Sequence, residues 1–351
     1  MKRKLTAMLL TAAMITSMIP VAGAASGTPN EFYKQVGLEL LPARSEGVYD
    51  EPAHPLPDVD GSGFIREIEG WTPAPVESGL PVSVTEAEVG AVEISTAEEF
   101  QAITAGGSYV LTKDLDLTGV AWTPQNISGS LTLDGQGHTI KGLTLNPTQP
   151  VNCGLFASVN GAFTVKNLRL DGVEMDMAIT TNSYNSYYVA VLAGYAQATT
   201  LQNVVVDVNI TRTGNATPYI GGVLGEVNGK LTVSDCAFTV TIQDAEGFEA
   251  SGGGVMAGLA GNARSTTVVE RIYAKVDIDV TKATGSAAGG LFPYAGNSIR
   301  DSQIEVVLKG DDHNLGGVIA RRGGTFELDN CVVDTSLTGR GNLGGVVGSV
   351  S

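Results

Sequence analysis

Residues 221–242 read GGVLGEVNGKLTVSDCAFTVTI, and this stretch contains the two signals that decide the fold. A pair of glycines opens it, and apolar residues then alternate with small or polar ones, which is typical of short strands joined by tight turns. Asp235 interrupts the alternation where the chain is expected to bend, because aspartate and asparagine tolerate the left-handed backbone conformation. The stretch therefore predicts one unit of a β-structure that bends at two different places.

The glycine turn recurs along the chain, and its spacing predicts a stack of similar units. Seven copies are recognisable, at spacings from 27 to 36 residues. Periods of this size are typical of solenoids and related arrays, and the kind of element in each unit decides between them. In each copy, two apolar residues follow directly after a small residue. The small residues are Gly154, Ala190, Gly222, Gly254, Gly290, Gly317 and Gly345.

A second position recurs in the strand after each turn, and it predicts a corner. It holds Asn or Asp in five of six units and arginine in the other. Asn and Asp bond readily to neighbouring backbone groups, so stacked copies are expected to form a ladder along one edge of the coil. Arg271 departs from the pattern, and the corner is expected to loosen or to be rebuilt there. The six positions are Asn167, Asn203, Asp235, Arg271, Asp301 and Asn330.

These units predict an all-β fold, a right-handed parallel β-helix. Helical repeat arrays need helical spacing over ten or more residues of each unit, which this sequence lacks, and a propeller blade needs four strands in about 40 residues. Three short strands and one longer loop fit a single coil of a β-helix, and parallel crossovers are almost always right-handed. Residues 151–351 are assigned to the repeats, and their C-terminal end is expected to be uncapped because the sequence stops within the seventh unit.

Residues 95–150 are expected to form an N-terminal cap and the first coil. The sequence STAEEF at 95–100 places a Ser or Thr three residues before an acid, which is the capping-box signature of a short helix. Alternating strands follow in SYVLTKDLDLT and GSLTLDGQGHTIKGLTL. Such a cap covers the strand edge that would otherwise template aggregation.

Residues 1–25 predict export. Three early cations, an apolar run from Leu5 to Val21 and the small residues that follow are typical of a secretory signal peptide, and no other stretch is long and apolar enough to span a bilayer. The chain carries 21 Lys+Arg against 37 Asp+Glu, a net charge of -16, which excludes binding of nucleic acid or an anionic membrane through a basic face. We expect a secreted or cell-surface bacterial protein that has no integral membrane span after signal removal.

Residues 26–94 are predicted to form an acidic, proline-rich leader that contains a candidate calcium loop. The segment holds 8 of the 14 prolines, and 13 acidic residues against 3 basic ones. Asp58, Asp60, Ser62 and Glu69 have the spacing of oxygen ligands in a twelve-residue calcium loop, with Gly61 at the turn. The flanks are rich in proline and glycine and lack the helices of an EF-hand, so an ordinary acidic turn is the alternative. Calcium is the one cofactor that this pattern suggests.

A cluster of tyrosines gives the candidate ligand-binding residues. Five of the ten tyrosines lie within 36 residues, around the loop TTNSYNSYY. Tyr184, Tyr187 and Tyr188 beside Asn and Ser have the chemistry to stack on sugar rings or to anchor a protein partner. Packing of these rings against the coil is the alternative.

The repeat resembles the GLUG-motif repeats of bacterial exported and cell-surface proteins. The resemblance lies in GGVLGEVNGKLTVSDCAFTVTI, in its echoes GGLFPYAG and GGVVGSVS, and in the entry segment TAEEFQAI with the strands that follow it. It covers residues 95–351 and implies a β-helical fold. Such repeats occur in large surface proteins, in adhesin-like molecules and in non-catalytic parts of some secreted peptidases, so the resemblance implies no catalytic residues.

We therefore expect a structural or adhesive binding module for an extracellular glycan or protein. One alternative is a polysaccharide lyase or glycoside hydrolase of the parallel β-helix type, and another is the non-catalytic stalk of a larger secreted peptidase. Catalysis is less favoured because no acid–base constellation recurs on one predicted face. The residues considered for it are Asp114, Asp116, His138, Asp311, Asp312, His313, Arg321 and Arg322.

Overall fold

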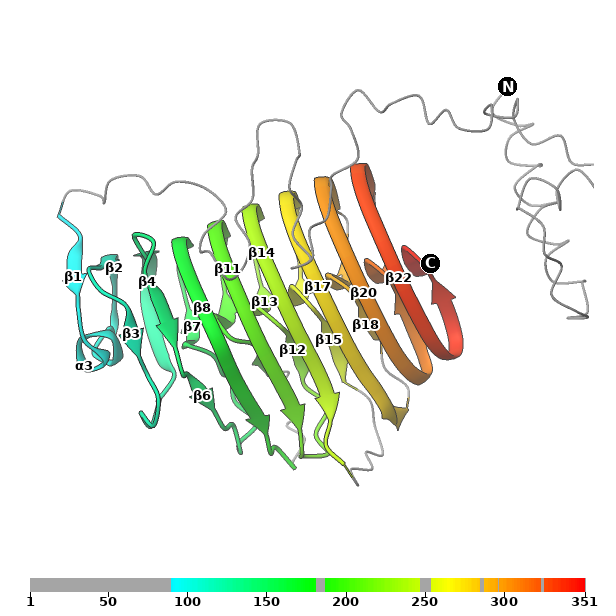
Figure 1. The fold of residues 1–351 in the computed structure, drawn as a ribbon, viewed down its shortest axis with the longest axis horizontal. Coiled ribbons are helices and arrows are strands. Elements are labelled where there is room, and N and C mark those ends of the chain that lie inside the picture. The colour runs from blue at the N-terminus through cyan, green and yellow to red at the C-terminus, as the bar shows by residue number, and fades with distance from the viewer. Residues whose placement is uncertain are drawn as a thin grey trace, which may run out of the picture. The chain divides into compact units, whose positions relative to one another are not determined.

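The computed structural model describes residues 90–180, 187–246, 254–284, 287–295, 297–322 and 325–350, and they form a parallel β-helix (Figure 1). All strand pairings given for these residues are parallel, as the repeats predict. Among the described residues, no helix has the length and apolar character needed to cross a bilayer.

The N-terminal cap is built as the sequence predicts. The short helix starts after Thr96, whose hydroxyl accepts a hydrogen bond from the backbone N–H of Glu99, while the Glu99 carboxylate accepts one from the Thr96 N–H, each at 3.1 Å. Phe100 is buried against the rings of Trp122 and Phe156. The elements here are β1 (Val92–Ile94), α3 (Ala97–Gln101), β2 (Ala105–Leu111), β3 (Leu115–Asp116), β4 (Gln125–Asp134), β5 (Thr139–Lys141) and β6 (Thr144–Leu145).

The leader boundary predicted at residue 94 is slightly wrong. Residues 92–94 form β1 and pair in register with residues 109–111 of β2, so they belong to the capped solenoid. Their alternation was too short to be recognised in the sequence, because three residues provide barely one period of a strand.

Six long strands form the broad sheet that faces the viewer in Figure 1. Each is paired with the equivalent strand of the coil before it, almost residue for residue. Apolar side chains on alternate positions point into the solenoid and stack on one another, as Val206, Phe238 and Ala274 do. The strands are β8 (Phe163–Met177), β11 (Thr199–Arg212), β14 (Leu231–Asp244), β17 (Thr267–Thr284), β20 (Asn297–Gly316) and β22 (Glu327–Gly344).

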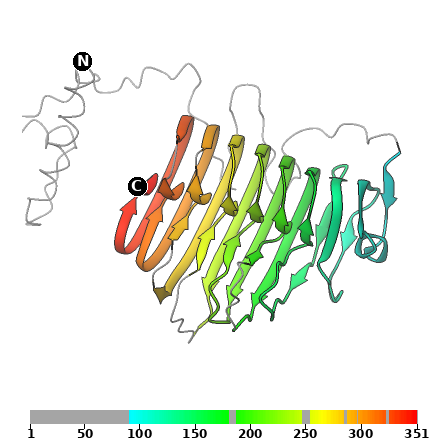
Figure 2. The same cartoon turned by 180° about the vertical axis from the view of Figure 1, so that it is seen from behind.

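Short strands complete each coil in two further stacks, which Figure 2 shows from behind. A coil of the repeat region therefore consists of three strands, for example β12, β13 and β14. The first stack contains β9 (Tyr188–Val189), β12 (Tyr219–Gly221), β15 (Val255–Ala257) and β18 (Ala287–Gly289). The second contains β7 (Phe156–Val159), β10 (Ala193–Ala196), β13 (Leu224–Val227), β16 (Ala260–Ala263), β19 (Phe292–Ala295), β21 (Ile319–Arg322) and β23 (Val347–Val350).

The predicted corner lies inside the long strands and is confirmed residue by residue. All six positions have a left-handed backbone, with φ between +47° and +56°. Their side chains bond along the stack: Asn203 donates to Asn167 at 2.9 Å, Asn167 donates to Asp134 at 2.9 Å, and Asn330 donates to Asp301 at 2.7 Å. We call this row of six residues, with Asp134 at its end, the corner ladder.

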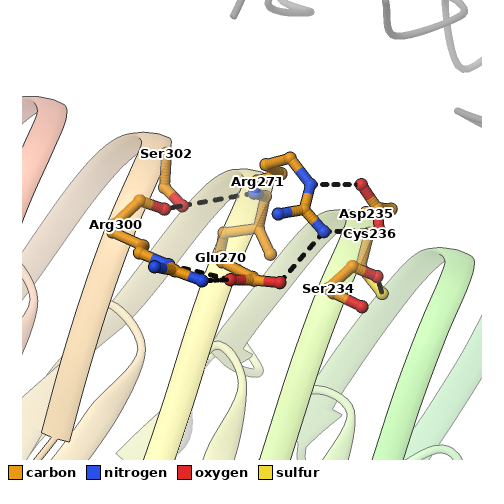
Figure 3. Close-up of polar contacts among 8 residues, drawn as sticks. Ser234, Asp235, Cys236, Glu270, Arg271, Arg300 and Ser302 are labelled. Carbon is orange, nitrogen blue, oxygen red and sulfur yellow. Dashed lines mark hydrogen bonds and ion pairs between the residues drawn. The ribbon is translucent and has the colours of Figure 1, made fainter. Parts of the chain in front are cut away.

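Arg271 keeps the corner rather than loosening it. Its φ is +51°, and its guanidinium bonds twice to the Asp235 carboxylate, at 2.6 and 2.9 Å. Figure 3 shows the guanidinium between Asp235 and Glu270, with Arg300 on the far side of Glu270. The ladder is thus rebuilt with charged groups at this coil, which is the second of the two outcomes expected from the sequence.

The glycine turns form the other recurrent bend, and two of the assigned positions are wrong. Gly258 rather than Gly254 stacks on Gly222, because Ile220 pairs with Met256 and Leu224 with Ala260. Ala190 stacks on Gly221, one residue earlier than assigned, since Val189 pairs with Ile220. The sequence GGGVMAGL at 252–259 offers two possible glycine positions, and the strand pairings on either side of the turn decide which one is used. The stacked column is Val191, Gly222, Gly258, Gly290, Gly317 and Gly345.

Candidate functional site at the glycine bend

The glycine bend turns the chain sharply between the two stacks of short strands. In the coil of β12 and β13 the bend is Gly221-Gly222-Val223. A Cβ built on Gly221 would overlap the carbonyl oxygen of Leu224, and one built on Gly225 would lie 2.8 Å from Cβ of Tyr188. The two stacks therefore approach each other closely on this side, and glycine is required because a side chain has no room there.

Side chains from both stacks meet over this bend. Arg264, directly after β16, donates to the Glu226 carboxylate of β13 through Nε at 2.8 Å and through Nη2 at 3.2 Å. Asn262 donates to the same carboxylate at 3.1 Å. The Arg264 guanidinium also donates to the hydroxyl of Tyr188 in β9, at 3.2 Å. We name Tyr188, Tyr219, Glu226, Asn262 and Arg264 the bend cluster.

Burial differs strongly within the bend cluster. Glu226 is only 4% exposed, whereas the Arg264 side chain is 53% exposed. The paired carboxylate raises the pKa of Arg264 above its usual value, and the Tyr188 hydroxyl adds to this, so the guanidinium stays charged. A buried carboxylate thus fixes an exposed cation in one orientation, because a two-point guanidinium–carboxylate contact restricts rotation of both groups.

Two tyrosines form the aromatic part of the cluster. Tyr188 and Tyr219 are neighbours in the first stack, and their ring centroids lie 5.4 Å apart at an angle of 44°. Burial raises the pKa of Tyr188, and the Glu226 carboxylate raises it further. Tyr188 is 7% exposed while Tyr219 is half-buried, so Tyr219 offers the accessible ring.

The polar row continues along the second stack, on the same side of the sheet as Glu226. Gln197 and Asn228 both donate to the hydroxyl of Tyr195, at 3.0 and 3.1 Å. Burial raises the pKa of Tyr294, while Arg321 opposes this. The stacked residues are Ser158, Tyr195, Glu226, Asn262, Tyr294, Arg321 and Ser349.

This arrangement combines the groups that recognise polar, ring-shaped or extended ligands. A half-buried aromatic ring offers an apolar face, and an exposed guanidinium and an amide offer donors beside it. The spacing between equivalent residues of adjacent coils is about 4.8 Å, so the row presents such groups repeatedly along one direction. The cluster has the chemistry for binding and contains one carboxylate, which is buried and fully engaged with Arg264 and Asn262.

The structure places only part of the tyrosine group predicted as ligand-binding. Tyr184 lies outside the described residues. Tyr187 and Tyr188 are 5% and 7% exposed, and Tyr188 belongs to the bend cluster while Tyr187 packs into the core. Burial raises the pKa of Tyr187 to about 12. Their burial agrees with the packing alternative for these two rings, whereas the accessible ring, Tyr219, comes from the next coil.

The candidate calcium loop of Asp58, Asp60, Ser62 and Glu69 also lies outside the described residues, so calcium binding stays a prediction. Within the part of the chain that the structure describes, no three His, Cys, Asp or Glu side chains are grouped so that they would hold a metal ion.

The residues considered for catalysis are dispersed. His138 Nδ1 lies 3.1 Å from the Asp114 carboxylate, which also accepts the Thr139 N–H, and that backbone bond is the main reason why the pKa of Asp114 is lowered. Hydrogen bonds from Thr118, and then from Lys141, lower the pKa of Asp116 to about 2. Both carboxylates lie in the cap. Arg321 is exposed on β21, and the side chains of Asp311, Asp312, His313 and Arg322 are outside the described part.

Sequence reasoning missed Glu226, Asn262 and Arg264. The sequence contains a signal for Glu226, because it is the one acidic residue among the apolar and small residues of VLGEVNG at 223–229. Its partners come from the next coil, 36 and 38 residues further along the chain. Correct alignment of the glycine bend at Gly258 would have placed Asn262 directly beside Glu226, so the misplacement at Gly254 hid the pair.

Comparisons with known proteins support no family assignment. No family model matches the chain, and no curated protein matches it. Among solved structures, the chain is similar to a protein from Bacteroides ovatus described as a "putative immunoglobulin A1 protease", with 16% sequence identity, a TM-score of 0.46, and coverage of 76% of this chain and 86% of that chain. The GLUG-motif resemblance stays a prediction.

Proposed function

We propose that the protein is an exported bacterial β-helix module of the GLUG-repeat type that binds an extracellular glycan or protein at the cell surface through the bend cluster. The observation that supports this most directly is the pairing of the exposed Arg264 guanidinium with the buried Glu226 carboxylate. An exposed cation that is held in place by a buried partner is arranged to meet a polar group from outside the molecule, because little side-chain freedom is left to lose on binding.

The neighbouring Tyr219 ring supports the same function. It is half-buried against Tyr188 and therefore rigid, and a rigid aromatic ring beside donors is common in sites that bind sugars or protein loops. Asn262 adds an amide on the adjacent coil, 3.1 Å from the Glu226 carboxylate. Together these residues provide stacking and hydrogen bonding without requiring any chemical step.

The test is a glycan array and a surface-protein binding assay on the mature chain and on three variants. Arg264→Gln and Tyr219→Ala are expected to lose most of the binding signal. Arg300→Gln is the matched control, because Arg300 is 52% exposed and is paired with a carboxylate, Glu270, at the corner instead of the bend. Arg300→Gln is expected to bind as the unaltered chain does.

Two results would contradict the proposal. If Arg264→Gln binds as strongly as Arg300→Gln and the unaltered chain, the bend cluster does not take part in binding. Release of reducing ends from any polysaccharide by the unaltered chain, measured in the same samples, would favour the lyase or hydrolase alternative over a binding module.

A further inference from the structure

A second arginine lies in the polar row of the second stack and is held in a similar way to Arg264. Arg321 of β21 is exposed, and the side-chain amide of Asn314 lies 2.9 Å from its Nε and 2.7 Å from its Nη2. With the amide oxygen turned toward the guanidinium, Asn314 accepts a hydrogen bond from both nitrogen atoms. Arg264 uses the same two nitrogen atoms to donate to the Glu226 carboxylate. We call Arg264 and Arg321 the arginine pair.

Both members of the arginine pair keep hydrogen-bond donors for a ligand. A guanidinium has N–H donors on all three of its nitrogen atoms, in one plane. In each arginine, Nε and Nη2 face the protein, and no residue that the structure describes accepts a hydrogen bond from Nη1. The N–H groups of Nη1 are therefore left for an acceptor from outside the molecule, and a carboxylate suits a fixed, planar guanidinium well.

The arginine pair spans two coils of the solenoid. Arg264 follows β16 directly, and β19 and β21 are the next two strands of the second stack. Adjacent coils are about 4.8 Å apart, so the two residues are separated by about 10 Å along the solenoid axis. Glu226, which holds Arg264, lies one coil further still from Arg321, since it pairs with Asn262 of β16. The two guanidinium groups therefore do not converge on one small anion, and they suit a linear ligand with several acidic groups.

A tyrosine stands in the coil between the two arginines. Tyr294 of β19 pairs with Arg321 of β21 and is half-buried. Burial raises the pKa of Tyr294, Arg321 lowers it and Tyr219 raises it, so the Tyr294 hydroxyl lies within electrostatic reach of both residues. Tyr219 and Tyr294 thus provide two half-buried rings beside the arginine pair, and such rings offer flat apolar faces for stacking. A glycan with acidic groups uses the rings and the guanidinium groups, whereas an acidic peptide chain uses only the guanidinium groups.

The local charge also favours an acidic ligand. In the polar row the charged groups are Glu226 and Arg321, and Arg264 adds a second cation beside it. This face thus carries two cations against one buried carboxylate, although the whole chain has a net charge of -16. Exposed charges more than about 8 Å apart are largely screened at physiological ionic strength, so distant acidic residues do little to repel a ligand here. The facing column of the first stack is uncharged and consists of Tyr188, Tyr219, Val255, Ala287, Asn314 and Asn342.

We propose that the arginine pair binds a linear acidic polysaccharide, with carboxylate groups along its length, that runs parallel to the solenoid axis over Tyr219 and Tyr294. The inference rests on the proposed function, because it names the ligand class of the bend cluster and extends the site to Arg321. Each guanidinium is already fixed by its protein partner, so little side-chain freedom is lost when a carboxylate binds. The polymer reaches both arginines because it extends along the direction in which the coils stack.

Binding of two polyuronates, polygalacturonate and alginate, to the mature chain tests the proposal. Affinities are measured by biolayer interferometry at neutral pH without calcium, so that no metal ion bridges the acidic polymer to the protein. At least one polyuronate is expected to bind, and Arg264→Gln and Arg321→Gln should each weaken its binding about tenfold or more, the factor that loss of one charge-assisted hydrogen bond implies. Arg300→Gln is the matched control, because it removes a half-exposed guanidinium from the corner instead. Equal affinities of Arg321→Gln and Arg300→Gln would overturn the proposal.

Two further polymers decide the ligand class. Polyglutamate carries carboxylates on a peptide chain, and dextran presents sugar rings without charge. Both are expected to bind much more weakly than the polyuronate. Polyglutamate that binds as tightly would overturn the assignment to a glycan, and dextran that binds as tightly would overturn the role of the carboxylates.

The outcomes also separate this inference from the proposed function. If neither polyuronate binds while Arg264→Gln loses another ligand in the glycan array or the surface-protein assay, the inference fails and the proposed function stands. If no ligand depends on Arg264, both fail. Arg264→Gln leaves the buried Glu226 carboxylate without its cation and is the variant that is less certain to fold. Arg321→Gln leaves only the neutral Asn314 behind, so it decides the matter should Arg264→Gln fail to fold.

Discussion

The corner ladder and the glycine bend both turn the chain in every repeat, but they do so by opposite means. At the corner ladder a side chain accompanies each left-handed residue, and the side chains bond to one another, as Asn203 does to Asn167. At the bend the side chains are removed, and glycine lets two stacks of strands approach within contact distance. The corner thus satisfies its polar groups internally, while the bend brings polar side chains from neighbouring strands together above it.

This difference explains why a candidate site lies at the bend. Asn203 in the ladder is fully buried, and its amide bonds within the stack. Arg264 and Tyr219 are partly exposed, and they are held by contacts to Glu226 and Tyr188. Binding at a bend requires polar groups that are both rigid and accessible to a ligand. Glycine has no side chain, so the glycine turn leaves room for the polar side chains of the neighbouring strands.

The largest effect is expected from adding a side chain to the glycine bend. In Gly290→Ala the new Cβ would overlap the carbonyl oxygen of Gly317 in the next coil and would lie 2.7 Å from Cγ2 of Val306. Both neighbours are fixed, one as backbone and one in the packed core. The expected loss is about 3 kcal/mol of the free energy of unfolding, as for overpacked cores, measured by urea denaturation.

Gly345→Ala is the control for that substitution. Gly345 stacks in the same column, but its Cβ would meet only the hydroxyl oxygen of Thr335, at 3.4 Å. The cost should therefore be small, because ordinary van der Waals distance needs almost no adjustment. If Gly290→Ala and Gly345→Ala lower the free energy of unfolding equally, the close approach of the next coil is not the reason why glycine is required at the bend.

A smaller effect is expected from removing a side chain from the corner ladder. Asn203→Ala keeps the left-handed φ of +54° without the side chain that makes it favourable, and it removes the donor that bonds to the side-chain oxygen Oδ1 of Asn167. The expected loss is about 2 kcal/mol. Asn203→Gly relieves the backbone strain but not the lost hydrogen bond, so urea denaturation should give it an intermediate stability. A glycine variant as stable as the unaltered chain would mean that the ladder bonds contribute nothing.

Much of the fold could be predicted from the sequence because the signals are local and repeated. Each corner residue, such as Asn167 or Asp301, interrupts an alternating strand, and the left-handed backbone follows from the residue type. The error at Gly254 shows the limit of this reasoning. Several glycines lie close together in the sequence there, and only the pairing of Ile220 with Met256 fixes which glycine is used.

The candidate site could be predicted only in part, since its contacts join residues of different coils. The tyrosine cluster was recognised in the sequence, yet the partners of Tyr188 are Tyr219, one coil on, and Arg264, 76 residues away. Which tyrosines face solvent depends on the packing of strands that no local pattern describes. Glu226 was not singled out because a single acid in a strand is ordinarily a solvated side chain, and its burial becomes apparent only when the coils are stacked.

The smallest effect is expected at the ion pairs of Glu270, which lie beside Arg271 of the corner ladder, and it distinguishes them from the amide bonds of the ladder. Burial opposes ionisation of Glu270, but the pairs with Arg300 and Arg271 outweigh it and keep the pKa of Glu270 below its usual 4.5. A depressed pKa contributes stability that is complete above the unfolded-state value and is lost as the pH falls through the folded-state value. Arg300→Gln should therefore cost less than about 1 kcal/mol near pH 6, since Arg300 is half-exposed, and still less at pH 3. The loss of stability caused by Asn203→Gly should stay the same at both pH values, because amides do not titrate.

Urea denaturation of both variants at pH 6 and pH 3 compares the two losses directly. A loss for Arg300→Gln that does not change with pH would show that the ion pair with Glu270 adds no stability to the corner.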